Sequence, residues 1–128
     1  MGYKVLIVDD SHIVRRVLIK AFGLADVAVE AFHEAGNGAE ALTFLRSQPV
    51  DIVFLDINMP VLNGMDFIRA VRADDDLRDT PIVIYSTDGS DSRREELERA
   101  DIQGYVRKPA SPEQLVQIFS SVLGGGTK

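Results

Sequence analysis

The feature that most constrains the fold is a set of short apolar runs rich in β-branched residues. Four runs are clear, at residues 4–8, 51–55, 82–85 and 104–106, and a weaker one covers residues 31–35. The two middle runs lack the alternation of apolar and polar residues that a half-exposed strand shows. Strands without that alternation are buried on both faces, as in a parallel sheet covered by helices. We therefore predict a sheet of this kind.

Apolar residues at helical spacing separate these runs. In the first helical segment they form two neighbouring stripes, which consist of Ile13, Val17 and Ala21 and of Val14, Leu18 and Phe22. Shorter patterns of the same kind cover residues 41–45, 67–71 and 97–100. Each pattern is typical of a helix that packs one face on a core. Residues 24–30 fit neither a helix nor a strand clearly, and we leave them unassigned.

The last helix has the clearest start signal. Ser111, Pro112 and Gln114 predict a capping box with proline in the first turn. The residues expected to face inward are Leu115, Ile118, Phe119 and Val122. The chain thus contains five βα units, and short right-handed crossovers join such units into a doubly wound open parallel sheet of the α/β class.

The amino-acid composition limits the kinds of protein that these units can form. With 128 residues, of which 45% are hydrophobic, the chain can bury the core of one domain. We expect that domain at residues 1–123 and a flexible Gly-rich tail at residues 124–128. The absence of cysteine excludes thiolate chemistry and fits a cytoplasmic location. No apolar run is long enough to cross a membrane, and the net charge of −6 disfavours direct binding to nucleic acid.

Four of the predicted strands end in, or are closely followed by, an acidic, hydroxyl or basic residue. Asp9 and Asp10 follow the first strand, Asp56 follows the third, Ser86 ends the fourth, and Lys108 comes after the fifth. In open parallel sheets, ligands bind at the carboxyl ends of the strands, so these groups should converge. Two carboxylates about 4 Å apart repel by roughly 4 kcal/mol at an effective dielectric constant near 20. Protonation of one acid would relieve this repulsion, but a Mg²⁺ ion with oxygen ligands does so without neutralising the acids.

A metal beside a carboxylate, a lysine and a hydroxyl is suited to phosphoryl transfer, in which catalysis consists largely of positioning and charge neutralisation. Asp56 is then the nucleophile, and the product is an aspartyl phosphate. Aspartate at a strand end is also common in ordinary turns. The recurrence of polar groups at four strand ends favours the functional interpretation over that alternative.

Several motifs together resemble the signature of one family. They are Val8-Asp9-Asp10-Ser11, Asp56-Ile57-Asn58-Met59-Pro60, Asn63-Gly64, Ser86-Thr87 and Lys108-Pro109. Their order and their places resemble the receiver domain of two-component response regulators, of the CheY-like kind. The resemblance implies a flavodoxin-like sheet with strand order 2-1-3-4-5. The chain departs from the family pattern at Ala110, because an aromatic residue often follows the Lys-Pro pair in this family.

The resemblance also implies roles for individual residues. Asp9, Asp10, Asp56 and the Asn58 backbone carbonyl would hold Mg²⁺, and Ser86 and Lys108 would contact the phosphoryl oxygens. Ser86 and Tyr105 would form the switch that changes the surface of the fourth helix, fifth strand and fifth helix. The expected partners are a sensor histidine kinase or phosphotransfer protein and a downstream protein. Such a domain is expected to be a monomer, and its own phosphorylation and dephosphorylation are its only enzymatic activity.

Three other functions can be weighed against this one. Gly36, Gly38 and Ala41 fit a dinucleotide-binding fingerprint, but they follow the second strand rather than the first. A phosphatase would need a second acid two residues after Asp56, where the chain has Asn58. A flavodoxin-like electron carrier would need a phosphate-binding loop where Asp9 and Asp10 lie. The sequence leaves the cognate kinase and the downstream target open.

Overall fold

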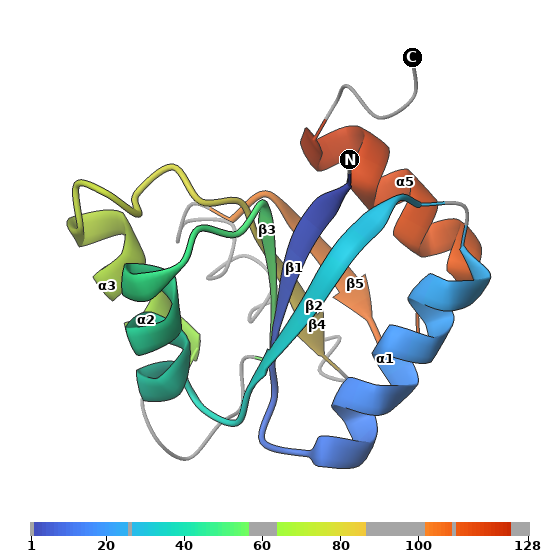
Figure 1. The fold of residues 1–128 in the computed structure, drawn as a ribbon, viewed down its shortest axis with the longest axis horizontal. Coiled ribbons are helices and arrows are strands. Elements are labelled where there is room, and N and C mark those ends of the chain that lie inside the picture. Colours follow the sequence, from blue (N-terminus) through green and yellow to red (C-terminus); the bar gives the residue numbers. More distant parts are fainter. Residues whose placement is uncertain (1, 26, 57–63, 87–101, 109, 124–128) are drawn as a thin grey trace.

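A single parallel sheet forms the centre of the molecule. The computed structural model describes residues 2–25, 27–56, 64–86, 102–108 and 110–123. Within them the strands are β1 (Tyr3–Val8), β2 (Val29–Ala35), β3 (Ile52–Leu55), β4 (Ile82–Ser86) and β5 (Gly104–Arg107). Their order is β2-β1-β3-β4-β5, and all neighbouring pairs are parallel (Figure 1). The predicted fold class and strand order are therefore confirmed.

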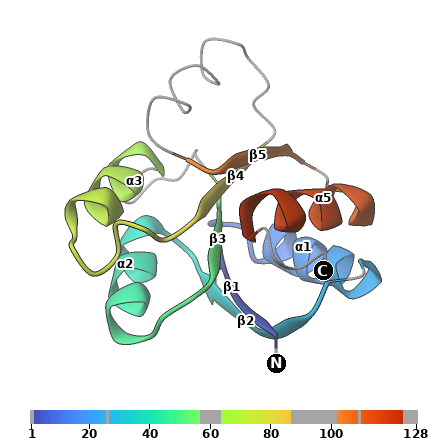
Figure 2. The ribbon, with the colours of Figure 1, turned by 90° about the horizontal axis from the view of Figure 1, so that it is seen from above.

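Helices cover both faces of this sheet. The described helices are α1 (His12–Leu24), α2 (Gly38–Ser47), α3 (Gly64–Ala73) and α5 (Pro112–Leu123). Helices α2 and α3 lie on one face, and α1 and α5 lie on the other (Figure 2). The helix predicted at residues 97–100 and the tail predicted at residues 124–128 fall outside the described residues.

The core has two halves, one on each face of the sheet. Along β1, Leu6 and Val8 belong to the buried cluster under α2 and α3, whereas Val5 and Ile7 belong to the cluster under α1 and α5. All four residues of β3 are fully or almost fully buried. Since each face needs apolar side chains, alternate residues are both apolar, which is why the sequence of β3 and β4 shows no alternation.

Helix α1 shows which of its two apolar stripes faces the core. Leu18 and Phe22 are 0% and 2% exposed, whereas Ile13 and Val17 are 74% and 50% exposed. A helix that lies on a sheet buries one stripe, and the neighbouring stripe, about 100° further round, is left in solvent. In the unassigned segment, α1 ends at Leu24 and β2 starts at Val29.

The start of α5 is capped as the sequence predicts. The Ser111 N–H donates to Gln114 Oε1 at 2.9 Å, and the Gln114 N–H donates to Ser111 Oγ at 3.2 Å. These two bonds form a reciprocal capping box. Of the residues expected to face inward, Leu115 and Phe119 are buried, and Ile118 and Val122 are half-buried.

The glycine-containing loop before α2 also serves as a helix cap. Asn37 Oδ1 accepts the Glu40 N–H at 2.9 Å, and Glu40 Oε1 accepts the Gly36 N–H at 2.9 Å. The Glu40 carboxylate thus binds a loop N–H beside the helix N-terminus at which a dinucleotide would place its pyrophosphate. This arrangement explains the loop sequence as a helix cap, without a nucleotide.

The cap on α2 gives a prediction about stability. Replacement of Asn37 by alanine leaves the Glu40 N–H without its side-chain acceptor, so the free energy of unfolding should fall by about 1 kcal/mol. Asn37→Gly should cost only a few tenths of a kcal/mol, because glycine is tolerated at this position. Urea denaturation measures both values, and equal stability of Asn37→Ala and the parent would contradict the capping role.

Candidate functional site

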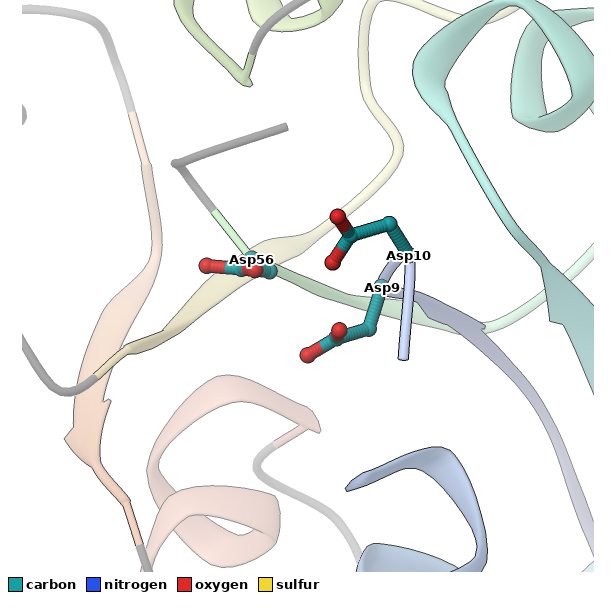
Figure 3. A group of neighbouring side chains, drawn as sticks. All are labelled: Asp9, Asp10 and Asp56. Carbon is teal, nitrogen blue, oxygen red and sulfur yellow. The ribbon is translucent and has the colours of Figure 1, made fainter. Parts of the chain in front are cut away.

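Strands β1 and β3 bring three carboxylates together. Asp9 and Asp10 follow β1, and Asp56 follows β3 (Figure 3). The Asp56 N–H donates to the Val8 carbonyl at 2.9 Å, and the Asp9 N–H donates to the Ala35 carbonyl at 3.1 Å. The sheet ladder therefore continues into the acids and fixes their backbones. One oxygen from each carboxylate lies within 4.8 Å of the others, as expected for strand ends that share one edge.

Burial makes this arrangement costly. Asp9 is 2% exposed and Asp56 is 8% exposed, whereas Asp10 is exposed. At such separations the two buried carboxylates repel by roughly 3 to 4 kcal/mol if the effective dielectric constant is near 20. Groups that carry positive charge are therefore needed beside them.

Lys108 supplies one such group. Its ammonium Nζ lies 2.6 Å from Asp9 Oδ2 and 3.7 Å from Asp56 Oδ2, and its side chain is 13% exposed. Three carboxylates and one ammonium leave a formal charge of about −2 in this group of four side chains. The hard oxygen donors and the residual charge fit a divalent cation, and Mg²⁺ prefers a small number of carboxylates completed by water and phosphate.

Arg15 holds the loop that carries Asp9, and the sequence analysis missed it. Its guanidinium donates to the Asp9 backbone carbonyl and, at 3.0 Å, to Glu34 Oε1 at the end of β2. The Ser11 N–H also donates to Asp9 Oδ1 at 2.8 Å. The only sign of Arg15 in the sequence is a basic residue one helical turn after the cap of α1. The groups that accept its hydrogen bonds become clear only when β1 and β2 are known to be neighbours.

Ser86 and Tyr105 lie on neighbouring strands. Ser86, at the end of β4, is 1% exposed, and its carbonyl accepts the Lys108 N–H at 2.9 Å. The register pairs Ile84 with Tyr105. Ile84 belongs to the buried cluster under α2 and α3, and the half-buried Tyr105 packs against that cluster. Since Ser86 follows Ile84 by two positions, its side chain leaves the same face of the sheet. Ser86 and Tyr105 thus lie on one face of neighbouring strands, whereas Asn58 falls outside the described residues.

Tyr85 lies beneath Lys108 and is a second residue that the sequence analysis did not single out. The centre of its ring is 5.2 Å from Lys108 Nζ, and the residue is 3% exposed. Burial raises the pKa of the Tyr85 hydroxyl above its ordinary value of 10.0, and the negative charge of Asp9 acts in the same direction. A hydrogen bond from the backbone of Ala110 opposes this shift. The hydroxyl is therefore neutral at physiological pH.

No described helix has both the length and the apolar character needed to cross a membrane.

The chain is similar to known proteins along most of its length. The family model described as "Response regulator receiver domain" matches residues 5–120. The chain is 33% identical to the "Chemotaxis protein CheY homolog" of Campylobacter jejuni, and the alignment covers 97% of this chain and 95% of that protein. It is 35% identical to the "Chemotaxis protein CheY" of Pseudomonas aeruginosa, with coverage of 94% and 99%.

A solved structure gives the same result. The chemotaxis protein CheY4 of Vibrio cholerae superposes with a TM-score of 0.81 at 33% sequence identity, and the match covers 95% of this chain and 99% of that chain. The similarity thus extends over nearly the whole length of both molecules.

The acidic cluster gives a prediction about metal binding. Asp10→Asn removes one carboxylate from the group, so Mg²⁺ affinity should fall at least about tenfold. The fold should survive, because the loss of one negative charge relieves repulsion in the metal-free protein. Glu30→Gln is the matched control, since it removes the same charge from an exposed residue near the start of β2.

Isothermal titration with MgCl₂ measures the affinity, and thermal unfolding measures the stability. Parent-like Mg²⁺ binding in Asp10→Asn would contradict the assignment of this cluster as the metal site. Unfolding of that variant would show that the carboxylate has a structural role instead.

Proposed function

Because the chain belongs to the response regulator receiver domains of two-component systems, we propose that it receives a phosphoryl group on Asp56. The donor is a histidine kinase, a phosphotransfer protein or a small phosphodonor. The observation that carries the proposal is the acidic cluster with Lys108 beside it, since this set of charges is suited to a metal-assisted phosphoryl transfer.

Asp56 acts as the nucleophile. One of its carboxylate oxygens attacks phosphorus, the bond from phosphorus to the donor breaks, and the donor leaves with the electron pair. The aspartyl phosphate then carries the phosphoryl group. Asp56 is suited to this task because it lies at the edge of the sheet where parallel strands place their ligands. Only 8% of its surface is exposed to solvent.

In this proposal Asp9 and Asp10 would hold the metal together with Asp56, and the Asn58 backbone carbonyl would complete the protein ligands. A bound Mg²⁺ ion would neutralise part of the charge that develops on the phosphoryl oxygens. Lys108 neutralises another part. Its ammonium is 2.6 Å from Asp9 and 3.7 Å from Asp56, so it lies between a metal ligand and the nucleophile. If Asp9 held the metal, its carboxylate would compete less for this ammonium, which would then be available to the phosphoryl group.

The signal leaves the site through Ser86 and Tyr105. In the proposal, the Ser86 hydroxyl moves to contact a phosphoryl oxygen, and Tyr105 turns into the space that this movement opens. Their position on one face of neighbouring strands supports this coupling. The result is a changed surface on β5, α5 and the helix predicted at residues 97–100, where a downstream protein binds.

The remaining features of the proposal follow from the family. The protein acts as a cytoplasmic monomer, and it is not an enzyme beyond its own phosphorylation and dephosphorylation. The relatives described above are named as chemotaxis proteins. A protein of the chemotaxis system is therefore the first downstream partner to test.

Phosphorylation gives the first prediction of this proposal. Incubation with acetyl phosphate and Mg²⁺ should add one phosphoryl group, and removal of Mg²⁺ with EDTA should prevent the addition. Asp56→Asn should abolish the addition, because an amide is not an effective nucleophile. Asp76→Asn is the control, since it changes an exposed acid in the loop after α3. Intact-protein mass spectrometry measures the product, and persistent labelling of Asp56→Asn would refute the proposed acceptor.

The switch gives a second prediction. Beryllofluoride with Mg²⁺ imitates the phosphorylated state and should change the side-chain NMR signals of Tyr105 in the parent. Ser86→Ala should weaken this change, because the variant lacks the hydroxyl that is proposed to move toward the phosphoryl oxygens. Identical Tyr105 signals with and without beryllofluoride in both proteins would exclude Tyr105 from the switch.

A further inference from the structure

We propose that Tyr85 is a positioning residue, which holds the Lys108 ammonium in place for phosphoryl transfer to Asp56. The inference deepens the proposed function and rests on it. It arises from the position of a buried aromatic ring directly beneath the one described ammonium group that contacts both Asp9 and Asp56.

The sheet places Tyr85 in the same row as the two buried acids. Val8 pairs with Leu55, and Leu55 pairs with Ile84, so one step further along each strand lie Asp9, Asp56 and Tyr85. Tyr85 in turn pairs with Val106, two residues before Lys108. Tyr85 and Val106 both belong to the cluster under α1 and α5, which places Lys108 above this face as well.

Tyr85 contacts Lys108 through the face of its ring. The centre of its ring lies 5.2 Å from Lys108 Nζ, which is within the range of a cation–π interaction. Ala110, which has only a methyl group, packs against the same buried cluster to which Tyr85 belongs. The ring therefore lies between the ammonium and this part of the core.

A restraint of this kind matters because a lysine side chain is long and flexible. The 2.6 Å contact with Asp9 holds the ammonium in the metal-free molecule, but in the proposed reaction Asp9 becomes a metal ligand. The Tyr85 ring does not take part in metal binding and remains beneath the ammonium. Since a ring face attracts a cation without a directional hydrogen bond, Lys108 can turn from Asp9 toward Asp56 while it stays on the ring.

Two substitutions separate the ring from the hydroxyl. Tyr85→Phe keeps the ring and removes the hydroxyl, whereas Tyr85→Leu removes the ring and keeps a large apolar side chain. With acetyl phosphate and Mg²⁺, we expect Tyr85→Leu to be phosphorylated about tenfold more slowly than the parent, because the ammonium is no longer held. Tyr85→Phe should lose about threefold or less. Mg²⁺ affinity should change by less than about twofold in both, since the metal ligands are intact.

Phe119→Leu controls for the loss of a buried ring. Phe119 is 4% exposed in the same cluster but belongs to α5, and its ring partners are Tyr3, Phe22 and Phe54. This variant should be destabilised without slower phosphorylation. If Tyr85→Leu and Phe119→Leu slow phosphorylation equally, the effect is one of packing, and the positioning role is refuted.

A double-mutant cycle tests whether Tyr85 acts through Lys108. In a Lys108→Met background the ring has no ammonium to hold, so Tyr85→Leu should cause no further loss of rate. An equal loss in both backgrounds would overturn the proposal.

A second readout does not depend on phosphorylation. The protons next to the Lys108 ammonium should show a ring-current shift by NMR that persists in Tyr85→Phe and disappears in Tyr85→Leu. If the shift is the same in all three proteins, the ring does not hold the ammonium, and the inference fails. Absence of phosphorylation in the parent would instead refute the proposed function, and this NMR comparison would still decide whether Tyr85 holds Lys108.

Discussion

The repulsion between the carboxylates of Asp9 and Asp56 is the constraint on which the rest of the site depends. Both acids are almost fully buried, and backbone hydrogen bonds from Asp56 to Val8 and from Asp9 to Ala35 fix them to neighbouring strands. Their backbones cannot move apart without disruption of the sheet. Taken alone, the repulsion of this pair would be a substantial part of the roughly 5 to 15 kcal/mol by which a domain is stable. The ammonium of Lys108, which lies 2.6 Å from Asp9 and 3.7 Å from Asp56, offsets it.

The same constraint gives the site its chemistry. A pair of carboxylates held close together attracts cations, and the structure places Lys108 against both of them. Arg15 and Tyr85 then support different parts of this arrangement, since Arg15 holds the backbone of Asp9 and Tyr85 lies beneath the ammonium. In the proposed function, a divalent cation and a phosphoryl group bind where the fold has already concentrated opposite charges.

The sequence predicted those features of the fold and of the site that depend on local patterns. Uninterrupted apolar runs identified the buried strands, and Asp9, Asp10 and Asp56 were found because parallel strands bring their ends to one edge. Arg15 and Tyr85 were missed because their contacts depend on which strands are neighbours and on which face a side chain leaves. The exposure of Ile13 and Val17 was open for the same reason, since two adjacent stripes on one helix look alike before the sheet is placed. Asn58 and the helix at residues 97–100 stay predictions.

The site of the acyl phosphate tests the central claim most directly. After incubation with acetyl phosphate and Mg²⁺, borohydride reduces an aspartyl phosphate to homoserine, and peptide mass spectrometry then locates the modified residue. If Asp56 is the nucleophile and its neighbours hold the metal, homoserine should appear at position 56 and unmodified aspartate at positions 9 and 10. Homoserine at position 9 or 10, or at none of the three, would contradict the central claim.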